Sequence, residues 1–371
     1  LPVIVCMLVT HDARAEITVD TDTLRLTFGP SGSLESAIGC FPSCSDENTR
    51  IQQFGSSNIV VFEEFTAGSW SYFRSESSAG LELKFTHNSG ASTTWTVPSR
   101  GYLLTLKVDR PGSVAIRSGE SFRPREAAGF GAWLEQSRYV IIGDGDVTQV
   151  GFDDEAEVTV TDSGWLGYRN RYWTLLAAPP PISDARLESA ESQLDASLVV
   201  ESEPGEWSLY IGPVEPEILK QSAAGLDNIL YAGLWFWLRW ISLALFYLLG
   251  WIKMVVPSWG ISVILLSLAI SILMTPFNRI AERLQQEVNE TEARLAPELR
   301  RIKKKYKGGE QSEKILELYK AEQVHPLYSL KGMMGMVLII PVFIGAFNML
   351  AENIHLLNAG FLWISDLSRP D

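Results

Sequence analysis

Apolar and polar residues alternate along residues 16–215, and this pattern predicts strands. The alternation is clearest in the segments ITVDTDTLRLTF, LELKF, EVTVTD and EWSLYIG, which are separated by clusters of Gly, Ser, Asn and Pro. A period of two places every second side chain on the same face, as in a half-buried strand. We therefore expect one large all-β sandwich over residues 16–215, with a long exposed loop at PPPISDARLESAESQLDA, around residue 180.

After residue 220 the alternation gives way to long apolar runs, which predict helices of a membrane domain. Two of these runs, residues 258–276 and 329–352, are long enough to cross a bilayer, and Pro341 is expected to break the second. The charged segment between them has a helical period with a turn at Gly308 and Gly309, which is typical of a helical hairpin.

A third apolar run, Ile229–Val256, is long enough to span but carries charge. Arg239 and Lys253 lie within about 40° of each other on a helix, with Ser242 beside them. A charged stripe backed by Trp residues favours a helix that lies in the membrane interface. The predicted order is a linker and interfacial helix, a transmembrane helix, a cytoplasmic hairpin, a second transmembrane helix and an outer segment, over residues 220–257, 258–276, 277–328, 329–352 and 353–371.

Composition and charge narrow the functional classes. The chain has 371 residues and a net charge of −13, which argues against DNA as a partner because phosphate binding needs clustered Lys and Arg. Residues 279–331 are locally basic, with 12 Lys or Arg against 9 Asp or Glu. A cytoplasmic location of this segment agrees with the positive-inside tendency of membrane proteins.

Catalysis by the β region is not expected. Sugar epimerases of sandwich type need paired acid and base groups, and His87 is the one histidine within residues 16–215. We therefore expect a protein that is not an enzyme and has no cofactor. A carbohydrate-binding role for the sandwich rests on fold analogy alone.

Residues 1–15 resemble the remnant of an export signal. The run LPVIVCMLV is too short to cross a bilayer, and the small residues Ala13 and Ala15 precede Glu16 as at a signal-peptidase site. A truncated first anchor helix is the alternative, and both place the β region outside the cytoplasm. In that oxidising compartment Cys40 and Cys44 could form a disulfide. Two free thiols are the alternative, and no metal site is expected without nearby His.

Several motifs, in order along the chain, resemble the YidC family of membrane protein insertases. They are ITVDTDTLRLTF, GWLGYRNRYWTLLAAP, WGISVILLSLAISILMTPF, the charged hairpin, LYKAEQVHPL, IIPVFIGAFNML and FLWISDLS. The resemblance implies a bacterial inner-membrane protein with a periplasmic β-supersandwich, an interfacial helix and the first two helices of a five-helix core. It also implies that the remaining core helices are absent from this chain, which is expected to be a fragment or a divergent paralogue.

The family's insertases hold a hydrophilic groove that receives polar parts of nascent membrane proteins. The resemblance implies that Ser267, Ser271 and Thr275 line this groove on one helix face, together with Asn348 of the next helix. The family usually has Arg where Ser271 stands and Gln where Ile339 stands, so both departures remove polarity. Helix packing is the alternative, because hydroxyl residues four apart often bond to their own backbone or allow close approach.

Two classes of function remain. The first is an insertase whose partners are nascent membrane proteins and lipids, with the Sec translocon and the ribosome as further candidates. The second is a YidC-like paralogue that acts as a non-translocating subunit or scaffold. A cytoplasmic basic patch suits anionic lipid or ribosomal RNA, with a merely solvated helix face as the alternative. It comprises Arg300, Arg301, Lys303, Lys304, Lys305 and Lys307.

Overall fold

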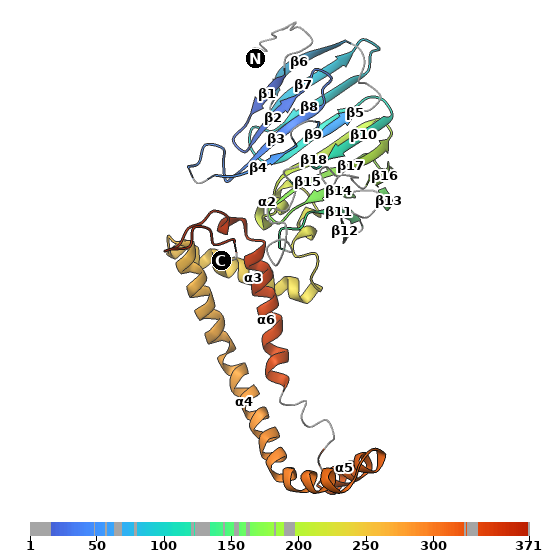
Figure 1. Ribbon diagram of the computed structural model, residues 1–371. Helices are drawn as coiled ribbons and strands as arrows, with labels where there is room; N and C mark the ends of the chain where they lie inside the picture. Colours follow the sequence, from blue (N-terminus) through green and yellow to red (C-terminus); the bar gives the residue numbers. More distant parts are fainter. Residues whose placement is uncertain are drawn as a thin grey trace. The chain divides into compact units, whose positions relative to one another are not determined.

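The computed structural model divides the chain into two compact units (Figure 1). We call Leu1–Leu234 with Leu350–Asp371 the β unit, and Trp235–Met349 the helical unit. The structure describes residues 16–47, 49–55, 58–62, 69–77, 80–119, 122, 134–143, 145–151, 156–160, 164–181, 183–188, 197–322, 324 and 333–369. The predicted export remnant, residues 1–15, lies outside the described residues.

Two antiparallel sheets form the β unit, as the alternation predicts (Figure 1). The described strands of the first are β1 (Ile17–Asp20), β2 (Leu24–Phe28), β3 (Leu34–Phe41), β4 (Arg50–Phe54), β5 (Val60–Phe62), β10 (Gly112–Arg117), β13 (Ala156–Val160), β16 (Ser183–Glu188) and β17 (Ser197–Ser202). Those of the second are β6 (Trp70–Ser77), β7 (Gly80–His87), β8 (Ser92–Val97), β9 (Leu103–Val108), β11 (Arg138–Gly143), β12 (Asp146–Gly151), β14 (Trp165–Arg169), β15 (Trp173–Ala178) and β18 (Gly205–Pro213).

Aromatic side chains fill the space between the sheets. Phe28 of β2 packs on Trp95 of β8, with 5.3 Å between ring centroids, and Phe54 of β4 meets Trp173 of β15 edge-on at 6.1 Å. All four side chains are buried. The indole N–H of Trp95 donates to Gly32 O at 2.8 Å, so its polar atom is satisfied within the core. Burial of such large rings removes much apolar surface from water and so stabilises the sandwich.

The predicted loop around residue 180 is wrong in part. Strand β16 occupies residues 183–188 of that segment and pairs with β13 on one side and β17 on the other. Its charged residues Asp184 and Arg186 are exposed while Ala185 is buried, so the alternation is present but short. The polar majority of the segment concealed this strand, because its apolar positions are few and the strand is short.

The chain leaves the sandwich through α2 (Pro216–Ser222) and the short 3₁₀ helix η3 (Leu226–Ile229). Glu215 caps α2 by accepting a hydrogen bond from Ile218 N at 2.8 Å, and burial raises the pKa of its carboxyl above the usual range. Leu226 and Ile229 are buried. The linker is therefore part of the β unit and holds the point where the helical unit begins.

After the helical unit the chain returns to the β unit. This returning segment, residues 350–369, includes the 3₁₀ helix η5 (Ile354–Leu356), whose Ile354 and Leu356 are buried. Arg50 of β4 donates to His355 O at 2.9 Å and to Leu357 O at 3.1 Å. These bonds fix the returning segment against the edge of the first sheet.

Two further arginines bind the same segment from the end of β14. Arg171 donates to Ala351 O, and Arg169 forms an ion pair with Glu352 at 3.1 Å. The buried guanidinium of Arg169 also donates to Ile229 O at 2.7 Å. One side chain therefore ties together the exit of the chain from the β unit and its return.

Within the described residues, four longer helices follow the linker. They are α3 (Phe236–Val255), α4 (Trp259–Lys305), α5 (Gly309–Ala321) and α6 (Met334–Ala351). By length and composition, α3 and α4 could each cross a membrane, and Ile339–Ala351 is a shorter apolar stretch. The turn between α4 and α5 is at Gly308, whose φ of 65° favours glycine, as the sequence predicts.

Two expectations about these helices are wrong. Helix α6 continues through Pro341, because a proline removes one backbone hydrogen bond and bends a helix without having to end it. Ser242 does not belong to a polar stripe with Arg239 and Lys253. It is fully buried on the face of α3 where Gly345 of α6 approaches, and its hydroxyl donates to Leu238 O at 3.2 Å.

We expect Arg169→Leu to destabilise the β unit by about 3 kcal/mol, because it leaves the Glu352 carboxylate without its ion-pair partner and the Ile229 carbonyl without its donor. The Arg169→Leu and Glu352→Leu double-mutant cycle should give a coupling of about 2 kcal/mol in denaturant unfolding. The exposed pair Arg25–Asp20, with 4.0 Å between charged atoms, is the control and should give less than about 1 kcal/mol. Equal couplings for the two pairs would refute a special role for Arg169.

Candidate functional site

The predicted polar stripe lies along one face of α4. Ser267, Ser271 and Thr275 follow at intervals of four residues and are all exposed within the described part of the chain. They are surrounded by large apolar side chains that are also exposed, among them Leu268 at 55% and Ile272 at 65%. A narrow hydroxyl row therefore runs along the apolar first part of α4, whose remaining exposed surface suits lipid.

Two of the three hydroxyls of the stripe, those of Ser271 and Thr275, have a backbone partner one turn earlier. Ser271 donates to Ser267 O at 2.8 Å, and Thr275 donates to Ser271 O at 3.0 Å. The same bond occurs at Ser262, which is buried near the start of α4 and donates to Ser258 O at 2.9 Å. The donor proton of these hydroxyls is used inside the helix, but the oxygen keeps acceptor capacity. The row can thus receive an N–H group and carries no charge.

Asn348 contributes an amide on α6 and is half-buried. Its Nδ2 donates to Ile344 O at 2.8 Å, again within its own helix. Among the described residues, no hydrogen bond joins Asn348 to the hydroxyls of α4. Ile339, on the same helix, is 46% exposed and apolar. Three of the four predicted groove residues, Ser271, Thr275 and Asn348, therefore donate within their own helices. No hydrogen bond between described residues joins the four into one network.

The predicted basic patch surrounds the turn between α4 and α5. Its six cationic side chains are all exposed. Lys303, Lys304 and Lys305 occupy the last turn of α4, where positive charge is favourable beside the free carbonyls of a helix C-terminus. Arg294 of α4 and Glu322 beyond α5 form an ion pair at 3.7 Å, which links the two helices as a hairpin. The patch is thus a dense positive surface on a defined turn.

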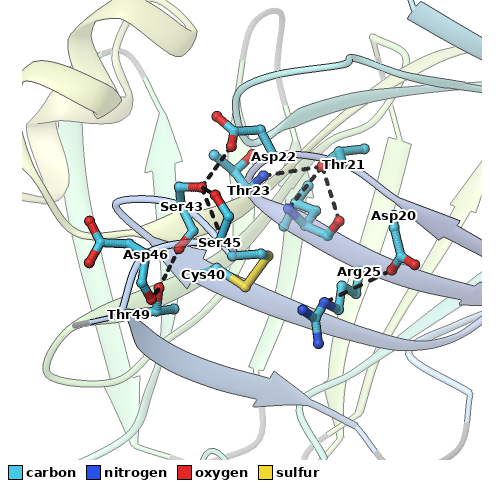
Figure 2. The surroundings of a disulfide bond; sticks show 12 residues. Asp20, Thr21, Asp22, Thr23, Arg25, Cys40, Ser43, Ser45, Asp46 and Thr49 are labelled. Atoms are coloured by element: carbon cyan, nitrogen blue, oxygen red, sulfur yellow. Dashed lines mark hydrogen bonds and ion pairs between the residues drawn. A yellow bond between two sulfur atoms is a disulfide. The ribbon is translucent and has the colours of Figure 1, made fainter.

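The structure joins Cys40 and Cys44 in a disulfide at the end of β3 (Figure 2). Cys40 N donates to Thr23 O at 2.9 Å, and Cys44 N donates to Asp22 O at 2.7 Å. Figure 2 also shows the Ser43 hydroxyl directed at Asp22, 2.6 Å away. The loop that the disulfide closes is therefore held to the β1–β2 turn by hydrogen bonds, and its role is structural. No cluster of three or more metal-ligating side chains occurs among the described residues.

Sequence reasoning missed Arg50, Arg169 and Arg171, which bind the returning segment. The motif WLGYRNRYWTLLAAP contains a sign of these buried arginines, because Arg169 and Arg171 stand between two apolar strand segments. Buried arginine is rare unless it is paired, so this pattern points to buried acceptors. The partner of Arg171 in the returning segment lies 180 residues later in the chain, and those of Arg50 lie more than 300 residues later, so sequence alone does not reveal them.

Comparisons with known proteins agree on one family. The family model described as 60Kd inner membrane protein matches residues 251–371. The membrane protein insertase YidC of Pseudoalteromonas atlantica is 29% identical over 277 residues, covering 70% of this chain and 47% of the relative. The YidC of Cellvibrio japonicus is 28% identical over 339 residues, covering 83% and 59%. The YidC of Vesicomyosocius okutanii is 32% identical over 234 residues, covering 59% and 41%.

Two solved structures also match over most of the chain. A crystal structure of an active YidC insertase with its first transmembrane domain resolved has a TM-score of 0.32 at 16% identity, covering 97% of this chain and 77% of that one. YidC from Thermotoga maritima gives 0.37 at 10% identity, covering 94% and 98%. The chain spans about half the length of the curated relatives that it matches. The matched relatives and the family model, taken together with the ordered motifs, support the YidC family as the group that this chain resembles.

Proposed function

We propose that this protein assists the insertion and folding of other membrane proteins by offering their polar segments a hydroxyl-lined path along α4. The observation that carries the proposal is the exposed row of Ser267, Ser271 and Thr275 on an apolar helix that is long enough to span a bilayer. The names of the relatives, which are called membrane protein insertases, support the same function.

The physical reason is the cost of moving a polar group into hydrocarbon. An amide or hydroxyl without a partner costs several kcal/mol there, on the order of 4–8 in an alkane reference. A hydroxyl oxygen on α4 can accept a hydrogen bond from a passing N–H, and the amide of Asn348 adds a second polar surface on α6. Each such contact lowers the barrier without covalent chemistry, so the proposed mechanism needs neither cofactor nor nucleotide.

A topology follows from the charges and the aromatic face of α3. Trp235, Phe236, Trp240 and Trp251 are each at least 66% exposed, while Leu238, Leu245 and Leu249 are buried. Exposed Trp side chains favour the membrane interface, so α3 lies on the outer surface of the inner membrane. Helix α4 then crosses inward, the basic turn lies in the cytoplasm, α6 returns, and the β unit is periplasmic. The disulfide agrees with that oxidising compartment.

A scaffold function is the second candidate. The bonds from Ser271 and Thr275 to their own backbone favour it, because such hydroxyls can face a packed neighbour as well as a client. In that case the stripe is a contact surface for another helix of a membrane complex, and no polar segment passes along it.

Photo-crosslinkers placed at Ser271 and Thr275 should trap nascent membrane proteins on ribosome-bound insertion intermediates. Leu273 is the matched control, because it is 60% exposed on the same helix but lies about 200° around the axis from Ser271. We expect strong client adducts at the two stripe positions and few at Leu273. Equal yields at all three positions would contradict a directed path.

The substitution Ser271→Arg separates the two candidate functions. An open polar path accommodates a long cation, so insertion of clients should be retained or improved. A tightly packed helix face should lose stability by several kcal/mol when a charge is buried in it. Loss of folded protein together with absence of client adducts would therefore select the scaffold.

Replacing the six cations of the basic patch by Gln should weaken binding to anionic vesicles and to ribosomes, measured with the protein in neutral nanodiscs. Each basic side chain near an anionic surface contributes about 1 kcal/mol, so affinity at low salt should fall at least about tenfold. Lys84, Lys107 and Arg110, which are exposed on the β unit, provide the control substitutions and should change little. Binding that survives loss of all six charges would mean that the patch is only a solvated surface.

A further inference from the structure

The returning segment ends in a tight turn whose two corner residues are large and apolar. Phe361 and Ile364 pair as an isolated antiparallel bridge, with Phe361 N to Ile364 O at 2.8 Å and Ile364 N to Phe361 O at 2.9 Å. The corners, Leu362 and Trp363, are 75% and 84% exposed. We call these two residues the Leu–Trp tip.

The backbone of the tip is unfavourable for the residue it holds. Leu362 has a φ of 53°, in the left-handed region that Gly and Asn usually occupy in two-residue hairpin turns. A leucine in this conformation costs about 1 kcal/mol or more relative to glycine. The chain thus holds a large apolar side chain in water on a strained backbone, which indicates a use for that side chain.

The tip is held rigidly by the rest of the returning segment. The Asp366 carboxylate accepts hydrogen bonds from Asn358 N at 3.0 Å and Ser368 N at 2.9 Å, and Leu367 N donates to Ala359 O at 2.9 Å. Arg50 fixes the start of the segment through its two carbonyl contacts. The two apolar side chains therefore do not depend on a partner for their position, and they cannot collapse onto the sandwich without breaking this network.

Charge and sequence position favour lipid as the partner. Residues 353–365 contain no Asp, Glu, Lys or Arg, and the segment follows directly on the apolar helix α6, which ends at Ala351. Tryptophan prefers the boundary between headgroups and acyl chains, where its ring is apolar and its N–H can reach polar groups. Arg169 binds both Glu352, at the start of the returning segment, and Ile229, a few residues before the exposed aromatic residues that begin α3.

We infer that the Leu–Trp tip inserts into the outer leaflet at the headgroup boundary and anchors the β unit at the membrane surface. This inference rests on the proposed topology, which places the β unit on that side. Arg169 and Arg50 hold the returning segment on the sandwich. An inserted tip would therefore keep the sandwich at a fixed distance from the bilayer surface.

The test is lipid quenching of a single fluorescent label in the whole chain, reconstituted in vesicles. In a Cys6→Ser background, Leu362→Cys carries an environment-sensitive dye, and the disulfide-bonded Cys40 and Cys44 do not react. Trp363→Cys is a second labelling site. Ser89→Cys, in the exposed turn between β7 and β8, is the control on the same unit. Unfolding of each variant is measured first to establish that it is folded.

We expect blue-shifted emission at position 362 or 363 and quenching by lipids with a nitroxide just below the headgroup, several-fold stronger than at position 89. Quenching by aqueous iodide equal to that at Ser89 would show a solvated tip and overturn the inference. Blue-shifted emission without quenching by lipid would show that protein covers the tip and would overturn it equally. Since the label reports lipid contact and not client insertion, failure here leaves the client crosslinks at Ser271 as a separate result.

Discussion

The buried guanidinium of Arg169 closes the loop that contains the whole helical unit. It donates to Ile229 O on the way out and pairs with Glu352 on the way back. More than a hundred residues lie between these two partners, so a single side chain sets where the helices leave and rejoin the sandwich. A guanidinium suits this position because its planar fork can donate to a carbonyl and pair with a carboxylate at the same time. Arg171 and Arg50 extend the same attachment to Ala351, His355 and Leu357.

The second constraint is the requirement that polar groups in hydrocarbon find partners. In α4 the hydroxyls of Ser262, Ser271 and Thr275 meet it by donating to carbonyls one turn earlier. This arrangement lets the helix exist in lipid and still leaves oxygen acceptors on its surface. It also explains why the stripe is compatible both with a path for clients and with a packed helix face, which differ in the neighbour and not in the helix itself.

Much of the fold could be predicted from sequence because its signals are local. Alternation predicted the strands of residues 16–215, and Gly308 marked the turn between α4 and α5. Three predictions were wrong, two because a local pattern was weak or ambiguous and one because a distant residue approaches. In β16 a short apolar pattern lies among charged residues, so the strand was not predicted. Helix α6 continues through Pro341, where a break was predicted. Ser242 is buried on the face of α3 where Gly345 approaches, so it does not belong to the predicted polar stripe. The arginines that bind the returning segment could not be assigned partners, because their acceptors are mostly backbone carbonyls far along the chain. The stripe on α4 was visible from its spacing, but its neighbours were not.

In the proposed topology, the β unit and the turn between α4 and α5 lie on opposite sides of one membrane. Cysteine accessibility in intact spheroplasts measures this directly, with Ser89→Cys reporting the sandwich and Lys304→Cys reporting the turn, both in the Cys6→Ser background. A membrane-impermeant maleimide should label position 89 at once and position 304 only after the membrane is opened. Labelling of position 304 from outside, at the rate seen for position 89, would contradict the proposed topology and with it the path along α4.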